Sequence, residues 1–121
     1  MLLRIPSVLK PDQLAGVRQI LARSRFVDGK LSAGMAARQV KRNEELDPRA
    51  DEIGELNEVV MGSLVQHPVY RAGALPMRVA SPYYARYTTG MSYGDHVDDP
   101  IMRSDVPYRS DVSITVFLNE P

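Results

Sequence analysis

A histidine and an aspartate separated by one residue, His96 and Asp98, are the side chains of this sequence best suited to hold a metal ion. In a β-strand, residues two apart point to the same face, so an imidazole nitrogen and a carboxylate oxygen could reach one point. A second histidine from elsewhere would complete a 2-His-1-carboxylate triad, which holds iron(II) and leaves three coordination positions open. The spacing alone also fits a surface His–Asp hydrogen-bonded pair.

The composition limits the other kinds of site. There is no cysteine, which excludes disulfides and thiolate metal sites, and a 2-His-1-carboxylate site needs none. Lysine and arginine together number 15, as do aspartate and glutamate, so the formal net charge is zero. A nucleic-acid surface needs a basic excess, and the sequence therefore predicts no nucleic-acid partner.

Length and hydropathy indicate a small globular protein. A chain of 121 residues allows one modest domain, and an apolar content of 44% is normal for such a chain. The first nine residues lack the long apolar core of a signal peptide, because Arg4 and Pro6 interrupt them. No window is long and apolar enough for a membrane span. These features indicate a soluble, cytoplasmic protein with no membrane partner.

Two amphipathic helices are predicted in the first half of the chain. Residues 11–24 carry apolar side chains at helical spacing. Residues 48–66 begin with a proline that follows Asp47, a favourable N-cap. The pair His67 and Pro68 should end this helix, since a residue before proline avoids helical geometry. One face of the second helix is apolar: Ile53, Leu56, Val60 and Leu64.

Strands are predicted before and after these helices. A short strand is expected around Pro6, an extended turn at residues 26–29, and extended or loop structure at 30–42. After Pro76, valine and tyrosine replace the helical pattern, and residues 111–118 alternate as a strand with one apolar face. Helices followed by strands are the order of an α+β domain. So few strands would leave open sheet edges, and the domain looks unfinished.

A longer motif surrounds the candidate ligands: Tyr87-Thr-Thr-Gly90-Met-Ser-Tyr93-Gly-Asp-His96-Val-Asp98. It resembles the leading strand of prolyl-hydroxylase-like oxygenases. Four further stretches resemble the PKHD-type hydroxylase family, so that the resemblance covers essentially the whole chain: Ile5–Leu9, Phe26–Gly29, Gln39–Asn43 and Arg109–Leu118.

The resemblance implies a double-stranded β-helix, or jelly roll, with helices packed on one side. Helical support would span about residues 10–70, and the first barrel strands about 76–119. The chain would be the N-terminal part of a single dioxygenase domain, an incomplete barrel without its distal half. In the family, a third ligand histidine lies past Pro121, as does the arginine that holds the far carboxylate of 2-oxoglutarate.

The same resemblance implies roles for five residues. His96 and Asp98 would be ligands of iron(II). Tyr87 is a candidate for hydrogen-bonding the 2-oxoglutarate carboxylate, and a core tyrosine is the equal alternative. Thr115 and Phe117 are expected to line the same cavity, where Thr115 could donate to the co-substrate or simply line the pocket.

Other polar residues have simpler interpretations. His67 is expected to be a helix-end histidine and not the third ligand. Arg109 is expected to stabilise its loop by pairing with Asp105 or Asp111, or to face the substrate. Two positions match the family without an evident mechanism: Lys41 and Asn43.

The implied activity is hydroxylation of an unidentified substrate by dioxygen and 2-oxoglutarate, with release of succinate and CO2. L-ascorbate would be the reductant that restores iron(II). The substrate could be a peptidyl side chain or a small metabolite. Two other interpretations stay open: a non-catalytic fragment with two ligands and weak metal affinity, and a jelly-roll binding module without a metal. Exposed apolar strand surface would favour low stability or self-association, including a homo-oligomer.

Overall fold

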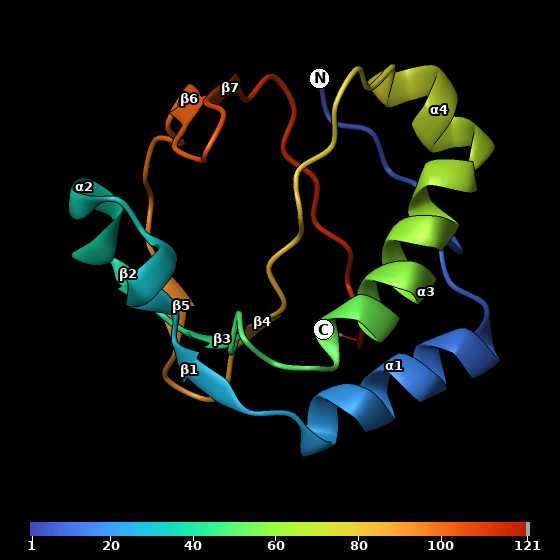
Figure 1. Ribbon diagram of the computed structural model, residues 1–121, viewed down its shortest axis with the longest axis horizontal. Helices are drawn as coiled ribbons and strands as arrows, with labels where there is room; N and C mark the ends of the chain where they lie inside the picture. The colour runs from blue at the N-terminus through green and yellow to red at the C-terminus, as the bar shows by residue number, and fades with distance from the viewer. Residues whose placement is uncertain (121) are drawn as a thin grey trace. The chain divides into compact units, whose positions relative to one another are not determined.

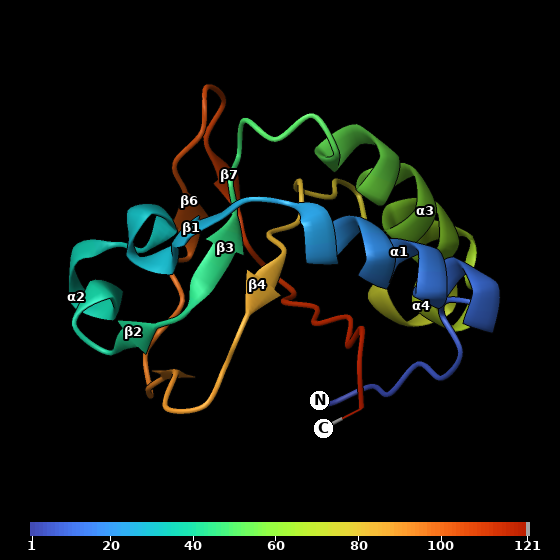
Figure 2. The ribbon, with the colours of Figure 1, turned by 90° about the horizontal axis from the view of Figure 1, so that it is seen from below.

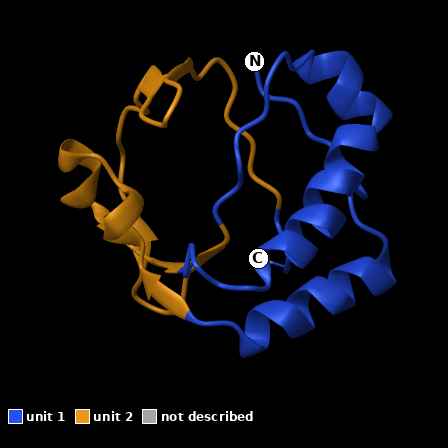
Figure 3. Ribbon diagram, in the orientation of Figure 1, with its two compact units in different colours: residues 1–25, 46–83, 117–121 blue, residues 26–45, 84–116 orange. Residues whose placement is uncertain are grey.

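The chain divides into two compact units (Figure 3). The computed structural model describes residues 1–120. Unit 1 contains residues 1–25, 46–83 and those from 117 on, whereas unit 2 contains residues 26–45 and 84–116. Figures 1 and 2 label the elements in two views of the ribbon. Mixed α and β content is thus confirmed, with the helical part and the strand part each built from separated segments.

The first helix, α1 (Pro11–Arg23), ends within one residue of its predicted range. Proline suits its first position, because the fixed φ is helical and the missing N–H would lack a helical partner there anyway. The Gln13 side chain accepts a hydrogen bond from the Lys10 N–H at 2.9 Å, which fixes the start despite the poor N-cap residue.

Unit 1 is built around α3 (Ile53–Gln66), which packs against both α1 and α4 (Pro68–Ala74). The predicted apolar face of α3 is confirmed at three positions, since Leu56, Val60 and Leu64 are all buried. The helical core is aliphatic apart from one tyrosine: Val17, Ile20, Leu56, Val60, Leu64 and Tyr70. No helix within residues 1–120 is long and apolar enough to cross a membrane.

The start of α3 differs from the prediction, which placed it at residue 48. Residues 48–52 form turns instead, because the Asp47 carboxylate accepts a hydrogen bond from the Arg49 N–H at 2.9 Å. The Asp47 carbonyl also accepts from the Ala50 N–H at 2.9 Å. An aspartate that bonds the backbone two residues on holds a turn, and here that turn delays the helix to Ile53.

His67 ends α3 as predicted and then begins α4, a helix that was not predicted. Its Nδ1 accepts a hydrogen bond from the Val69 N–H at 3.2 Å, so Nε2 carries the proton and donates to the Pro6 carbonyl at 3.1 Å. The imidazole therefore caps a helix. The interpretation of His67 as a helix-end histidine is confirmed.

Unit 2 contains short strands in three small sheets. The first sheet has the order β1-β3-β4 and the others pair β2 with β5 and β6 with β7. The pairings β3–β4, β2–β5 and β6–β7 are antiparallel. The elements of this part of the chain, in order, are β1 (Phe26–Asp28), a 3₁₀ helix η1 (Gly29–Ser32), α2 (Met35–Arg38), β2 (Lys41–Arg42), β3 (Glu44–Leu46), β4 (Ala85–Arg86), β5 (Ser92–Tyr93), β6 (Ile101–Met102) and β7 (Tyr108–Arg109).

Two predicted extended regions are different in the structure. The segment 30–42 was expected to be extended or loop, and it contains η1 and α2 before β2 begins. No strand forms around Pro6. There Ser7 has a φ of +56°, a left-handed conformation that reverses the local backbone, and proline has no N–H for a ladder.

The strand predicted at 111–118 is also absent, and residues 110–120 contain no strand. Alternation gives the segment an apolar face, but a strand exists only where a neighbour pairs its N–H and C=O groups. Val112 and Ile114 remain 60% and 42% exposed. Within residues 1–120 there is no closed barrel, and the expected jelly roll is represented only by small antiparallel sheets.

The turn before α3 gives a pH-dependent contribution to stability. The pKa of Asp47 is lowered first by the hydrogen bond from the Arg49 N–H and then by the Arg49 and Arg25 guanidinium groups, although desolvation opposes them. The charged form is therefore favoured in the fold. Its stabilising contribution is present above the unfolded pKa of about 4 and is lost as the pH falls through the lower folded value.

We expect Asp47→Asn, which keeps an acceptor for the Arg49 N–H but carries no charge, to lower the urea midpoint at pH 7. At pH 3 the difference from the unaltered protein should shrink, because the native carboxylate is partly protonated. Circular dichroism at both pH values measures this, and Asp51→Asn at an exposed position is the control. An equal difference at pH 3 and pH 7 would contradict the expectation.

Candidate metal centre

The segment that carries His96 and Asp98 follows β5 and is a loop, where a strand was predicted. Gly90 lies in the turn before β5 with a φ of +85°, a backbone conformation that glycine adopts without a Cβ clash. The chain thus reverses, pairs with β2 over two residues and then leaves the sheet. The shared direction of the two side chains consequently comes from their own contacts and not from strand pleating.

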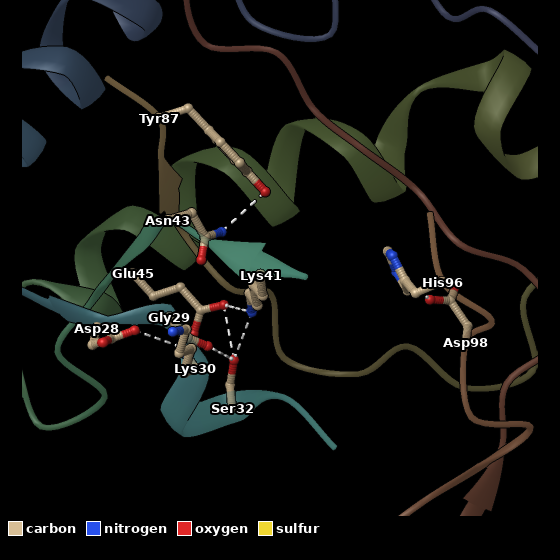
Figure 4. Close-up of polar contacts among 10 residues, drawn as sticks. All are labelled: Asp28, Gly29, Lys30, Ser32, Lys41, Asn43, Glu45, Tyr87, His96 and Asp98. Carbon is tan, nitrogen blue, oxygen red and sulfur yellow. Dashed lines mark hydrogen bonds and ion pairs between the residues drawn. The ribbon is translucent and has the colours of Figure 1, made fainter. Parts of the chain in front are cut away.

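The imidazole of His96 and the carboxylate of Asp98 point toward each other (Figure 4). Nε2 of the histidine lies 3.2 Å from Oδ1 of the aspartate. The imidazole side chain is 24% exposed and the carboxylate 67% exposed. The pair therefore converges at a point that solvent can reach from the aspartate side.

Two groups on the preceding residues hold the imidazole in place. Nδ1 lies 2.8 Å from the carbonyl oxygen of Gly94. The Tyr93 ring stacks on the imidazole with 3.7 Å between centroids and 28° between planes. Gly94 is itself fixed to β2, since its N–H donates to the Val40 carbonyl at 2.9 Å. One face and one edge of the ring are thus set by the β5 segment.

These contacts decide what Nε2 can do. A neutral imidazole has one N–H donor and one nitrogen lone pair. Because the Gly94 carbonyl can only accept, Nδ1 carries the proton and Nε2 has the lone pair. That lone pair faces an oxygen of the Asp98 carboxylate, which also only accepts. In this tautomer, a positive centre between the two atoms would make the contact favourable, as a metal ion does when it binds both.

The separation of the two donor atoms fits a metal ion. Nitrogen and oxygen ligands lie about 2.1 Å from a first-row divalent ion, and neighbouring ligands of an octahedron are then about 3.0 Å apart. The observed 3.2 Å between Nε2 and Oδ1 is close to that edge. No group of three or more His, Asp or Glu side chains that could hold a metal forms within residues 1–120. This part of the chain therefore offers two ligands.

A polar cluster lies in the same unit, where the buried Lys41 and Glu45 contact the exposed Ser32 (Figure 4). Lys41 Nζ lies 2.5 Å from Glu45 Oε1 and 3.0 Å from Ser32 Oγ, and the hydroxyl donates to Oε1 at 2.8 Å. The lysine and glutamate side chains are 8% and 9% exposed. Lys41 Nζ also lies 5.2 Å from the centroid of the Tyr93 ring. The cluster is thus joined to the residue that stacks on His96.

A second buried polar residue, Asn43, contacts Tyr87 (Figure 4). Its Nδ2 donates to the Tyr87 hydroxyl at 3.0 Å. Its Oδ1 is buried without a hydrogen-bond partner among the described residues, and it fills the space above Gly29. A Cβ added at Gly29 would lie 1.8 Å from that oxygen. The absence of a side chain at Gly29 therefore allows the amide to reach the tyrosine.

The remaining predicted residues have mixed outcomes. Arg109 pairs with Asp111, with Nε 2.6 Å from Oδ1, so the expected loop-stabilising pair is confirmed. Tyr87 is 49% exposed and bonded to Asn43, so it is not a core tyrosine, and its hydrogen bond to 2-oxoglutarate stays a prediction. Thr115 and Phe117 are exposed on the segment that forms no strand, and their place beside a cavity stays a prediction.

Sequence reasoning missed the buried polar residues around the pair. Lys41, Asn43 and Glu45 are buried, whereas Arg42 between them is exposed and Glu44 is partly exposed. Alternation with a period of two was therefore present in the sequence. It is hard to recognise because charged residues are nearly always exposed unless paired. The only available signal was that the stretch 39–43 matched the family without a mechanism.

A loop imidazole and carboxylate that converge at the edge length of an octahedron define the class of this site, a candidate for a non-haem metal ion held by nitrogen and oxygen. The comparison with curated proteins finds hydroxylases. A PKHD-type hydroxylase of Thioalkalivibrio sulfidiphilus is 48% identical over 122 residues, covering 100% of this chain and 54% of the relative. Others from Gluconacetobacter diazotrophicus and Acaryochloris marina are 40% and 42% identical over 124 and 121 residues.

The resemblance to PKHD-type hydroxylases is therefore confirmed over the whole chain, which is a relative of these proteins. The chain spans about half the length of the curated relatives it matches. No protein-family model matches it.

The close approach of the Asn43 amide to Gly29 can be tested by substitution. We expect Gly29→Ala to destabilise the protein by about 1–3 kcal/mol, because the new methyl group occupies the position of the buried Asn43 oxygen. Gly16→Ala is the matched control, since a Cβ there meets nothing within 4 Å and alanine favours a helix by about 0.5–1 kcal/mol. Urea unfolding measures both. Equal stability of the two variants would show that the amide does not need the glycine.

Proposed function

We propose that the protein is an iron(II)- and 2-oxoglutarate-dependent dioxygenase that hydroxylates an as yet unidentified substrate. His96 and Asp98 would supply two of three protein ligands to the iron. The observation that carries the proposal is the imidazole nitrogen that lies 3.2 Å from a carboxylate oxygen, an arrangement in which both atoms can bind one metal ion. The printed names of the relatives, PKHD-type hydroxylases, favour the metal.

The chemistry that bound iron would supply is the coupling of 2-oxoglutarate decarboxylation by dioxygen to hydroxylation of a C–H bond, with release of succinate and CO2. Ascorbate would serve as the reductant that keeps the iron ferrous. The contribution of this chain is to aim two ligands from one side and to leave the other positions open. A cytoplasmic location suits a cysteine-free protein that needs ferrous iron.

The proposal needs partners outside this chain. Within residues 1–120 the site has two ligands, and the relatives are nearly twice as long as the region they share with this chain. We therefore propose that residues 1–121 are the N-terminal part of one dioxygenase domain. A second histidine ligand and an arginine for the far carboxylate of 2-oxoglutarate would come from the part of the relatives that this chain does not span.

Tyr87 is the proposed hydrogen-bond donor to 2-oxoglutarate. Asn43 Nδ2 donates to the phenol oxygen, so the phenol hydrogen is not needed for that contact. With the oxygen fixed by a buried residue and 49% of the tyrosine exposed, the hydroxyl can donate to a carboxylate that arrives from solvent. Thr115 and Phe117 are kept as proposed lining of the same pocket, where the threonine hydroxyl could also donate.

The ligand assignment is tested in the full-length protein. We expect His96→Ala and Asp98→Ala each to abolish 2-oxoglutarate-dependent succinate release and to weaken Mn²⁺ binding at least about tenfold, because each removes one of three ligands. Asp99→Ala removes a neighbouring exposed carboxylate and should change neither. Succinate assays and Mn²⁺ titration give the two readouts. Undiminished succinate release by either ligand variant would refute the assignment.

The proposed role of Tyr87 predicts a larger effect on 2-oxoglutarate binding than on the chemical step. We expect Tyr87→Phe to raise the KM for 2-oxoglutarate about tenfold with a smaller effect on kcat, because a hydrogen bond to a charged group contributes about 1.5–3 kcal/mol. Asn43→Asp should raise KM similarly although the hydroxyl is kept, since a carboxylate there would accept the phenol hydrogen.

Tyr83→Phe, at an exposed tyrosine, is the control for this pair of variants. Steady-state kinetics with 2-oxoglutarate as the varied reactant gives both constants. An unchanged KM in Tyr87→Phe would remove Tyr87 from the proposed co-substrate site and leave it as a partner of Asn43 alone.

A further inference from the structure

We propose that Lys41 is a positioning residue of the metal site, which acts through Tyr93 to fix the orientation of the His96 imidazole. A role of Lys41 in catalysis rests on the proposed function. The orientation of the imidazole by Lys41 and Tyr93 can be measured in the protein without metal. No role follows for Lys41 from the sequence, where it is one charged residue in a short strand.

The first step is the pairing of β2 with β5. Lys41 is the direct Cα partner of Tyr93 in this antiparallel pair. The N–H of Gly94 extends the pairing by donating to the Val40 carbonyl at 2.9 Å. A Cβ at Gly94 would lie only 3.0 Å from Cβ of Val40, so the two backbones approach closely. Strand β2 therefore fixes the two residues that hold His96.

The second step is that the Lys41 ammonium is fixed more firmly than an ordinary lysine. Its side chain is 8% exposed, and Glu45 and Ser32 accept from Nζ at 2.5 and 3.0 Å. An ammonium group has three N–H donors, and these two acceptors use two of them. The third N–H is left for the Tyr93 ring, whose centroid lies 5.2 Å from Nζ. A desolvated cation over a tyrosine ring is attracted to it more strongly than an exposed one.

The buried ion pair of Lys41 and Glu45 fixes the position of the lysine charge. Taking Lys41 and Glu45 out of water is costly, and well-packed apolar residues often stabilise a fold as much or more. What an ion pair adds is a fixed position for Nζ, because glutamate and serine restrain it in two directions. That fixed charge holds the Tyr93 ring, and the ring stacks on the imidazole at 3.7 Å.

The stacking of Tyr93 on His96 matters because metal ligands must be closely oriented. A metal site tolerates a misplacement of only about 0.5 Å or 10–20° in its ligands. The Gly94 carbonyl fixes the edge of the imidazole through Nδ1, and the Tyr93 ring fixes its plane. If the tyrosine ring turns, the imidazole loses the contact that sets its plane and keeps only those at Gly94 and Asp98. Removal of the Lys41 ammonium should therefore change the orientation of the His96 imidazole, although Lys41 contacts neither candidate ligand.

The test begins with the metal-free protein. This chain contains two histidines, His67 and His96. The imidazole signals that disappear from the nitrogen–proton correlation spectrum in His96→Ala therefore belong to His96. We expect Lys41→Met and Tyr93→Leu to remove the ring-current shift of the His96 carbon-bound protons. We expect Tyr93→Phe, which keeps the ring, to preserve it. Arg42→Met removes an exposed cation from the same strand and should leave the His96 signals unchanged.

Mn²⁺ affinity is the second readout. Residues that orient a metal-bound histidine change affinity about 10–100-fold when removed. We expect a loss of at least about tenfold for Lys41→Met and Tyr93→Leu, and less than about twofold for Tyr93→Phe and Arg42→Met. Lys41→Met leaves Glu45 buried without its partner, so the double variant Lys41→Met/Glu45→Gln, which removes both charges, gives the same measurements should the single variant fail to fold.

The outcomes separate this inference from the proposed function. If His96→Ala loses Mn²⁺ binding while the folded Lys41 variants keep native His96 signals and affinity, the inference is overturned and the metal site stands. If the unaltered full-length protein, which would include the third ligand, binds no Mn²⁺, the proposed function fails. The His96 signals of Lys41→Met then still decide whether the lysine positions the imidazole.

Discussion

The antiparallel pairing of β2 with β5 is the interaction on which the candidate site depends. It spans only two residue pairs, Lys41 with Tyr93 and Arg42 with Ser92, and an isolated ladder of that size has little stability. Lys41 of this ladder is also held by its buried pair with Glu45. A strand that carries no candidate ligand is thus paired with the segment that holds His96.

The two units differ in what holds them together. Unit 1 has an aliphatic core along one face of α3, where side chains of similar volume can replace one another at small cost. In unit 2 the buried residues include Lys41, Asn43 and Glu45, whose burial is tolerated only while their partners remain. The supporting residues of the site are therefore more specific in type than the residues of the helical core.

The helices were the part most readable from the sequence, because the spacing of Leu56, Val60 and Leu64 states both the element and its buried face. The segment 111–118 was misread, since alternation defines a face but says nothing about a pairing partner. The spacing of His96 and Asp98 suggested convergence, which the structure has, although through a stacked ring and a carbonyl in place of a strand. The proposed role of Lys41 required the structure, because its partners Ser32, Glu45 and Tyr93 come from three separate points of the chain.

Both units are assembled from segments that are far apart along the chain, and this has a consequence for biosynthesis. Strands β2 and β3 leave the ribosome before the helices α3 and α4, whereas their partners β5 and β4 follow those helices. Helix α1 similarly waits for α3. High contact order of this kind slows folding and prolongs the exposure of unpaired strands. Because Lys41 and Glu45 are charged, we expect them to stay hydrated in the unpaired strands until β5 and β4 pair with β2 and β3.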